Sequence, residues 1–301
     1  MKRVFLALLV LLVSAGLAMA AGAKEAQKLG TEENPIIWAF VPSGDTQTIV
    51  AGGQAVSDLL FKKTGLYFKV MVATDYAGVI EALSSTPPKA HMASLATFAY
   101  VLAADRGVAQ AALVAVRFGT PYYNGQIIAN VKSGIKTLAD LKGKTFARPD
   151  PLSTSGWIIP ELTMRAAGIN PEKDLKQIVD AGGHTAVVTA VYNGDVDAGA
   201  TFVDARQNIQ KDHPDVNDKV KVINVSVNIP NDGVQFQKTV PQDLRDKITN
   251  ALLEIAQTPE GKDALKKAYS WTGLEKQGDN FYDPFRQVLQ SSGMKIEDLM
   301  K

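Results

Sequence analysis

The sequence of 301 residues contains no cysteine. It therefore forms no disulfide bond, offers no thiolate metal ligand or cysteine nucleophile, and carries no lipid-modified cysteine. It also lacks a large excess of one charge, because 32 basic side chains stand against 31 acidic ones. A surface that follows nucleic-acid phosphates usually needs a marked basic excess. These absences exclude a disulfide scaffold and give no reason to expect a nucleic-acid partner.

Long hydrophobic runs are also scarce, and the clearest one lies at the start of the chain. Met1-Lys2-Arg3 precedes an almost wholly apolar stretch, residues 4–17, which small residues follow. This order predicts a secretory signal peptide within residues 1–23, cleaved after Ala20 or Ala23. The alternative is a membrane anchor, but a spanning helix needs about 20 apolar residues and this run is shorter. We expect an exported protein, which is periplasmic in a cell with an outer membrane.

The remaining sequence alternates short apolar runs with segments of helical spacing. Residues 36–41 and 68–72 predict strands, and the segment between them predicts a helix that begins at Thr46 and stops at Gly65. The same alternation continues to about residue 268. Strands separated by helical segments predict βαβ units, an α/β fold and a mostly parallel sheet.

Two sets of such elements follow each other, and each begins with a strand, a turn and a helix. We predict one α/β domain from residues 34–118 plus 235–301 and a second, inserted domain from residues 122–230. The chain would cross between them near 117–124 and 226–235. Two domains joined by two crossings can hinge and close on a ligand. Ligands of open parallel sheets bind at the carboxyl ends of strands, so the loops there would line a cleft.

The clearest site signal is Ser153-Thr154-Ser155 before Gly156, between a predicted strand and a predicted helix. The first N–H groups of a helix have no partner within it, and the helix dipole makes this end positive. Hydroxyl groups add further donors, so an oxyanion such as phosphate could bind there without a lysine. The alternative is ordinary N-capping, for which Ser and Thr are favoured anyway.

Three further polar side chains lie at predicted loops. His184 begins a predicted helix after two glycines, where it could donate to an anion or simply be a solvated loop residue. Asp204 and Asp232 follow predicted strands or turns, and both could be ordinary surface aspartates. An ionised carboxylate only accepts hydrogen bonds, so beside an anion it would select a ligand that still has an O–H or N–H to donate. The histidines show no metal-ligand spacing, and we predict neither a metal nor a cofactor.

Four motifs in this order resemble the phosphate-, phosphite- and phosphonate-binding proteins of ABC importers. They are DYAGVI at 75–80, GI at 134–135 with LADLKGK at 138–144, STSG at 153–156 and IPND at 229–232. The resemblance runs from about Ile36 to Gly273. It implies a type II periplasmic binding protein fold, with two α/β domains around a hinged cleft. It also implies a monomer without enzymatic activity that captures a small phosphorus oxyanion and delivers it to membrane permease subunits.

The resemblance assigns ligand-binding roles to residues of both domains. Ser153, Thr154 and Ser155 would hold the anionic oxygens, with His184 helping. Tyr76, in the DYAG loop of the first domain, would contact the ligand across the cleft.

The remaining positions bear on which ligand is bound. Asp232 matches an acidic position that receives a ligand proton or amine. Asp204 stands where binders of aminoethylphosphonate have Glu, and Leu95 stands where they have a second ligand-facing Tyr. These two differences favour phosphite, methylphosphonate or hydrogen phosphate over an aminoalkylphosphonate. Leu95 would be an apolar wall, which leaves a fourth P–O group unsatisfied.

Two other functions stay open from the sequence. A secreted hydrolase could use Ser155 as nucleophile with His184 and Asp204 or Asp232, although Ser155 does not lie in a G-x-S-x-G motif. A cleft-type binder could instead take a sulfonate or a thiamine precursor. A sulfonate, however, has no proton to offer the two aspartates.

Overall fold

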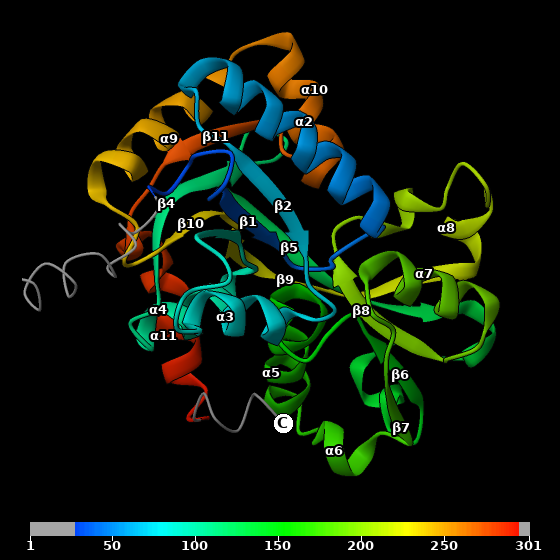
Figure 1. Cartoon of the computed structure of the whole chain (residues 1–301). Helices are drawn as coiled ribbons and strands as arrows, with labels where there is room; N and C mark the ends of the chain where they lie inside the picture. The colour runs from blue at the N-terminus through cyan, green and yellow to red at the C-terminus, as the bar shows by residue number, and fades with distance from the viewer. Residues whose placement is uncertain (1–27, 295–301) are drawn as a thin grey trace, which may run out of the picture.

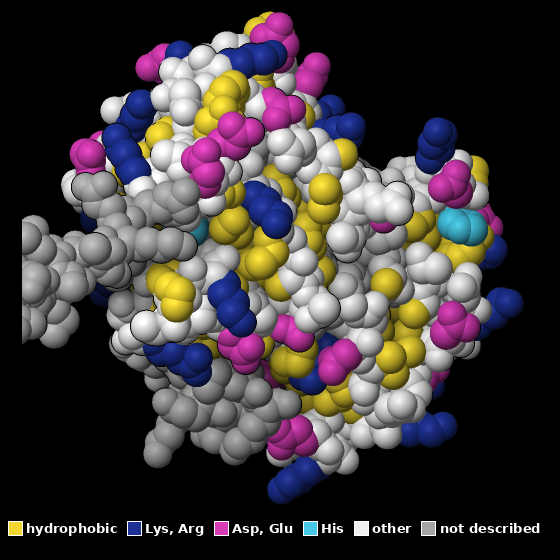
Figure 2. Space-filling model, viewed as in Figure 1, with side chains coloured by type: hydrophobic (Ala, Val, Ile, Leu, Met, Phe, Trp, Pro, Cys, Tyr) yellow, Lys and Arg dark blue, Asp and Glu magenta, His cyan; other side chains and the backbone are white. Residues whose placement is uncertain are grey.

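The computed structural model describes residues 28–294. The predicted signal peptide lies outside these residues. Within them, no helix has the length and apolar character that a membrane span requires. The described chain forms two β-sheets with helices packed around them, which confirms the predicted α/β class (Figure 1). Acidic and basic side chains are interspersed over the face shown in Figure 2, in keeping with the nearly balanced charge.

The first sheet has six strands in the order β11-β4-β10-β3-β1-β2. They are β1 (Ile36–Phe40), β2 (Phe68–Val72), β3 (Met92–Ser94), β4 (Ala109–Val116), β10 (Gly233–Gln237) and β11 (Gly273–Lys276). β1 is parallel to β2 and β3, but β10 is antiparallel to both β3 and β4. The sheet is therefore mixed, and the prediction of a mostly parallel sheet is wrong. The reason is that β10 returns from the second sheet and inserts between two strands that a βαβ unit would otherwise leave as parallel neighbours.

Helices cover both faces of this sheet (Figure 1). α2 (Thr46–Thr64), α9 (Gln242–Ile255) and α10 (Pro259–Tyr269) enclose one cluster of buried apolar side chains. α3 (Tyr76–Ser84), α4 (Thr97–Asp105) and α11 (Asp283–Ser291) belong to another. α2 has the predicted bounds, because Asp45 accepts the N–H of Thr48 at its start and Gly65 adopts a left-handed conformation (φ 71°) at its end. Gly52 lets α2 approach α10, since a Cβ there would lie 2.3 Å from the backbone nitrogen of Ala268.

The second sheet has five strands in the order β7-β6-β8-β5-β9. They are β5 (Tyr122–Asn130), β6 (Thr145–Arg148), β7 (Gln177–Asp180), β8 (Ala198–Phe202) and β9 (Val220–Pro230). The accompanying helices are α5 (Ile159–Ala166), α6 (Pro171–Asp174), α7 (His184–Asn193) and α8 (Val216–Lys219). β6 is parallel to β7 and β8, whereas β5 is antiparallel to β8 and β9. This sheet is mixed for a similar reason. The chain enters through β5 and leaves through β9, and β5 lies antiparallel between β8 and β9.

The chain passes between the two sheets twice, from β4 to β5 and from β9 to β10. The two passages lie side by side, because the N–H of Asn231 donates to the carbonyl of Pro121 at 2.8 Å. One cluster of buried apolar side chains extends across both halves, with Tyr76 and Phe98 from the first and Trp157 from the second. The halves are therefore packed against each other. The domain boundaries and the hinge stay predictions.

Candidate functional site

Three helices direct an N–H group of their first turn at an oxygen in the other half of the molecule. These bonds run from Tyr76 (α3) to Asp150 Oδ2 at 3.1 Å, from Phe98 (α4) to Thr154 Oγ1 at 2.9 Å, and from His184 (α7) to the carbonyl of Ser43 at 3.1 Å. Such N–H groups have no partner within their own helix, so each is free to bond elsewhere. The positive ends of helices from both halves therefore meet at the boundary between the two sheets.

The hydroxyl triplet lies at this boundary, and each of its members is at most 2% exposed. Ser153 is an ordinary N-cap, because its Oγ accepts the N–H of Gly156 at 3.2 Å. N-capping therefore accounts for one hydroxyl of the three. Thr154 bonds across to Phe98. Ser155 is not the N-cap of this helix, so N-capping does not explain its hydroxyl, and its contact with an anion stays a prediction.

The backbone at the triplet is not a regular α-helix. Residues Thr154–Ile158 form a π-helical turn, in which the N–H of Ile158 reaches the carbonyl of Ser153 at 3.0 Å, and α5 continues from there. Single π-helical turns of this kind are rare and occur frequently at functional sites. Gly156 permits the turn to pack, since a Cβ there would lie 2.3 Å from Pro149 Cδ. The sequence predicts a helix here but not its widened first turn.

His184 is 4% exposed and lies against the triplet. Its Nδ1 is 2.8 Å from Thr201 Oγ1, and its Nε2 is 3.5 Å from Ser153 Oγ. Burial, together with the positive charge of Arg117, lowers the pKa of His184 to about 3. The imidazole is thus neutral near pH 7 and has one N–H to donate. The structure brings His184 and Ser153 together, and His184 is not a solvated loop residue.

Of three buried tyrosines, Tyr76 and Tyr123 bring hydroxyl groups to serines of the triplet, and the Tyr269 hydroxyl donates to the carbonyl of Val41. Burial, reinforced by Tyr269 and other neighbours, raises the pKa of Tyr76 well above its ordinary value, although a hydrogen bond with Ser153 opposes this. Burial and the nearby Asp232 charge raise the pKa of Tyr123 to about 12, against an opposing hydrogen bond with Ser155. Burial also raises the pKa of Tyr269. Tyr76 is predicted from the sequence and the other two are not, because a lone tyrosine belongs to no motif.

Leu95 lies just after β3 and is fully buried. Its N–H donates to Gln235 Oε1 at 2.9 Å, and its side chain belongs to the apolar cluster that spans both halves. The side chain is therefore part of the buried apolar packing that the two halves share. Contact with a ligand stays a prediction.

Asp204 is bound by an arginine of its own loop. Arg206 donates to both carboxylate oxygens, with Nη2 2.6 Å from Oδ2 and Nε 2.9 Å from Oδ1, and Gln126 Nε2 adds a bond of 3.0 Å. Burial by itself raises the pKa of Asp204, but these hydrogen bonds outweigh it and hold the pKa below its ordinary value. The carboxylate is therefore ionised and already well supplied with donors.

Asp232 is bound by an arginine from the other passage of chain. Arg117 forms a salt bridge with it, and Trp271 Nε1 donates to Oδ2 at 3.1 Å. Arg117 is not among the residues predicted from the sequence. The sequence does contain a sign of this ion pair. Arg117 is the one basic residue in the two predicted crossings, and Asp232 is the one acidic residue.

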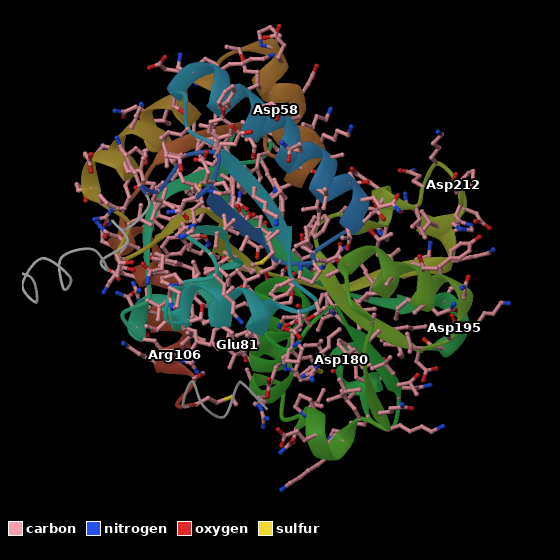
Figure 3. The ribbon with its side chains drawn as sticks, in the orientation of Figure 1. Asp58, Glu81, Arg106, Asp180, Asp195 and Asp212 are labelled. Atoms are coloured by element: carbon pink, nitrogen blue, oxygen red, sulfur yellow. The ribbon has the colours of Figure 1, made fainter. Side chains whose placement is uncertain are left out.

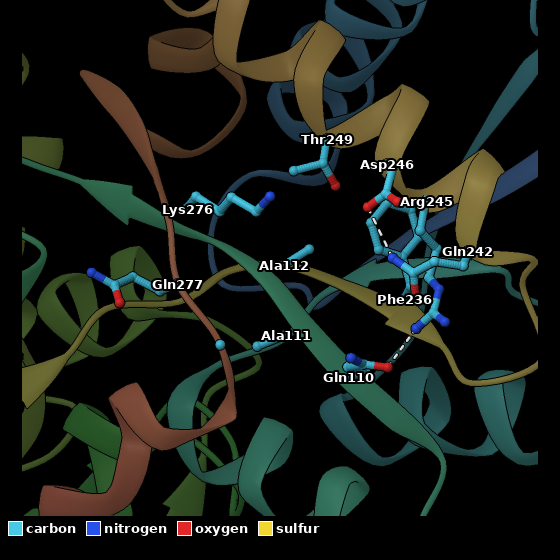
Figure 4. A pocket seen from close by; sticks show the side chains of 11 residues that line it. Gln110, Ala111, Ala112, Phe236, Gln242, Arg245, Asp246, Thr249, Lys276 and Gln277 are labelled. Carbon is cyan, nitrogen blue, oxygen red and sulfur yellow. Dashed lines mark hydrogen bonds between the residues drawn. The ribbon is translucent and has the colours of Figure 1, made fainter.

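Two hollows lie outside this cluster. A groove of about 650 Å³ runs between the halves, with Glu81 of α3 on one side and Asp180 at the end of β7 on the other (Figure 3). A pocket of about 280 Å³ lies among β4, β11 and α9 and is lined by Arg245, Lys276 and neighbouring polar residues (Figure 4). Neither hollow is lined by the triplet or by His184. Within residues 28–294, no group of three or more His, Asp or Glu side chains is placed to hold a metal.

Known proteins resemble this chain over most of its length. The family of ABC transporter phosphonate periplasmic substrate-binding proteins matches residues 38–282. The phosphonates-binding periplasmic protein of Escherichia coli is 30% identical over 232 residues, which are 75% of this chain and 68% of that protein. The phosphate-import protein PhnD of Mycolicibacterium smegmatis is 32% identical over 177 residues, which are 56% of this chain and 54% of that protein.

A solved structure has the same fold. PhnD1 of Prochlorococcus marinus, in complex with methylphosphonate, superposes with a TM-score of 0.75 at 16% identity, covering 86% of this chain and 98% of that one. This likeness confirms the type II periplasmic binding protein fold. Together with the match over residues 38–282, it leads to one conclusion. The chain belongs to the family of periplasmic substrate-binding proteins of phosphonate ABC transporters.

Proposed function

We propose that this protein captures a small phosphorus oxyanion (phosphite, methylphosphonate or hydrogen phosphate) between its two halves and delivers it to an ABC permease. The observation that carries the proposal is the set of buried, uncharged donors around Ser153, Thr154 and Ser155 at the start of a helix. The names of the relatives agree with this ligand class, since they refer to phosphonates, phosphate and methylphosphonate.

Uncharged donors suit reversible capture of an oxyanion. Hydroxyl and N–H groups that already point inward bind a charged oxygen without a large loss of conformational freedom. The helix N-terminus adds a partial positive charge directed at the same place. His184 and Tyr76 are held neutral by burial, so each offers a donor without a formal charge that the ligand would have to neutralise.

Release requires the halves to separate, and we propose that they move as two domains, residues 34–118 plus 235–301 and residues 122–230. The three N–H bonds across the boundary support a closed arrangement that differs from an open one, because each bond would break when the halves separate. In this proposal the protein is exported through its N-terminal signal peptide and acts in the periplasm as a monomer.

We propose further that the protein is not an enzyme. The ring nitrogens of His184 bond to Thr201 and approach Ser153, whereas a Ser155 nucleophile would need that base for itself. Asp204 and Asp232 bond to arginines instead of His184. The described residues therefore offer no Ser-His-Asp relay at Ser155.

Calorimetry and melting-temperature shifts with the exported form of the protein would test the proposal. We expect phosphite, methylphosphonate or phosphate to bind and raise the melting temperature, and methanesulfonate and thiamine to have no effect. An aryl phosphate ester should not be hydrolysed. Preference for the sulfonate or thiamine, or ester turnover that disappears in Ser155→Ala, would contradict the proposal.

A further inference from the structure

Arg117 stands at the first passage between the sheets, just after β4, and its guanidinium is fully used within the protein. Nε and Nη2 donate to the carbonyl of Tyr269 at 3.2 and 3.0 Å. Nη1 donates to Asn231 Oδ1 and Asp232 Oδ1, and Nη2 also donates to Asp232 Oδ2 at 3.1 Å. A guanidinium has five N–H groups, and five hydrogen bonds are formed. Arg117 therefore has no N–H left for an anionic ligand.

Asp232 is nearly saturated in the same way. Its Oδ2 accepts from Arg117 and from Trp271 Nε1, and its Oδ1 accepts from Arg117. A carboxylate has about four acceptor positions, so roughly one remains, on Oδ1. One ligand O–H can be accepted there. A ligand ammonium, in contrast, would face a carboxylate whose charge Arg117 already balances.

The pair lies beside the proposed binding site, because Thr97, which directly precedes Phe98, donates to the carbonyl of Pro230 at 2.6 Å, two residues before Asp232. The Asp232 charge contributes to the raised pKa of Tyr123, whose hydroxyl contacts Ser155, and the Arg117 charge contributes to the lowered pKa of His184. Both charges thus interact electrostatically with groups beside the triplet. The second acidic candidate is balanced as well, since Arg206 donates to both oxygens of Asp204. Both acidic candidates named from the sequence are therefore paired with an arginine.

We propose that Arg117 is a specificity-determining residue. Its positive charge balances the negative charge of Asp232, so that the site selects phosphorus oxyanions whose remaining substituent is uncharged. The inference rests on the proposed function and narrows its ligand class. It follows that removing the Arg117 charge alone would leave Asp232 as an uncompensated carboxylate. That carboxylate would repel an anion and attract an ammonium group, because neither charge is fully exposed to solvent screening.

The test measures binding of methylphosphonate and 2-aminoethylphosphonate by calorimetry. The wild type should bind methylphosphonate at least tenfold more tightly than 2-aminoethylphosphonate. In Arg117→Met the ratio of the two dissociation constants should change at least tenfold in favour of 2-aminoethylphosphonate binding. Adding Asp232→Asn to Arg117→Met removes both charges and should move the ratio back toward that of the wild type. Arg117→Lys keeps the charge and should keep the wild-type preference even if Arg117→Met folds poorly.

Arg286→Met is the matched control, because Arg286 is also held by ion pairs, to Asp279 and Asp283 on and beside α11, and should leave the ratio unchanged. Equal weakening of both ligands in Arg117→Met, with no recovery in the double variant, would overturn the inference. So would a wild type that binds 2-aminoethylphosphonate as tightly as methylphosphonate, although the proposed function would then survive. A wild type that binds no phosphorus oxyanion would overturn both.

Discussion

Thr154 Oγ1 accepts the N–H of Phe98 at 2.9 Å, so the central hydroxyl of the triplet in one half is bonded to the first turn of α4 in the other. Both residues are fully buried. The threonine oxygen is used for this bond, while its hydrogen remains available to a ligand oxygen. The same side chain can therefore take part in both ligand binding and the packing of the two halves.

Thr154→Val tests this coupling. The substitution keeps the shape of the side chain but leaves the buried N–H of Phe98 without its partner, which costs about 1–3 kcal/mol. We expect weaker binding of methylphosphonate and a smaller ligand-induced decrease in the radius of gyration, measured by small-angle scattering. Thr163→Val is the control, since that hydroxyl bonds only within α5. Equal compaction in Thr154→Val and the wild type would show that the bond does not support closure.

Ser155→Ala tests the hydroxyl that has no capping role. If its hydroxyl bonds a charged ligand oxygen, its loss should weaken binding by about 1.5–3 kcal/mol, measured by calorimetry. Ser57→Ala is a matched control, because Ser57 is equally buried but bonds to the carbonyl of Gly53 within α2. Unchanged affinity in Ser155→Ala would remove this residue from the binding site.

His184→Gln tests the neutral imidazole through pH. The pKa of His184 lies near 3 in the folded protein and at its ordinary value of 6.5 when unfolded. Below pH 6.5 the unfolded chain therefore binds more protons, and stability falls as the pH falls, by up to about 1.4 kcal/mol per pH unit. Between pH 7 and pH 5 the wild type should lose about 2 kcal/mol more than the variant.

Urea denaturation of both proteins at the two pH values measures this difference. His213→Gln serves as the control for replacing a histidine elsewhere, since His213 lies against Tyr192 away from the triplet. Parallel losses in the wild type and His184→Gln would mean that His184 is not buried as a neutral group in solution.

Leu95→Asn tests the predicted apolar wall. A polar side chain at this position could satisfy a fourth phosphorus oxygen, whereas leucine leaves it without a partner. We expect the ratio of the dissociation constants for phosphate and methylphosphonate to move about tenfold toward phosphate, as a single hydrogen bond allows. Leu95→Met preserves volume and should keep the original ratio. If both variants give the wild-type ratio, Leu95 does not face the ligand.

The sequence predicts those elements best whose ends are set by neighbouring residues. α2 has the predicted bounds because Asp45 and Gly65 act within one turn of its ends. β11 is not predicted, because four residues of a strand at the sheet edge carry little local signal. The direction of β10 depends on where the chain comes from in space, and hydrophobic periodicity contains no such information.

The α/β class and the position of the hydroxyl triplet at a helix start could be predicted from the sequence, because strand and helix patterns and helix-start residues act over a few positions. Which charges balance each other depends on the fold. Arg117 and Asp232 are 115 residues apart, and they meet because β10 returns beside β4. The fold also makes His184 neutral, since the pKa of an imidazole depends on burial and on charges brought close by folding.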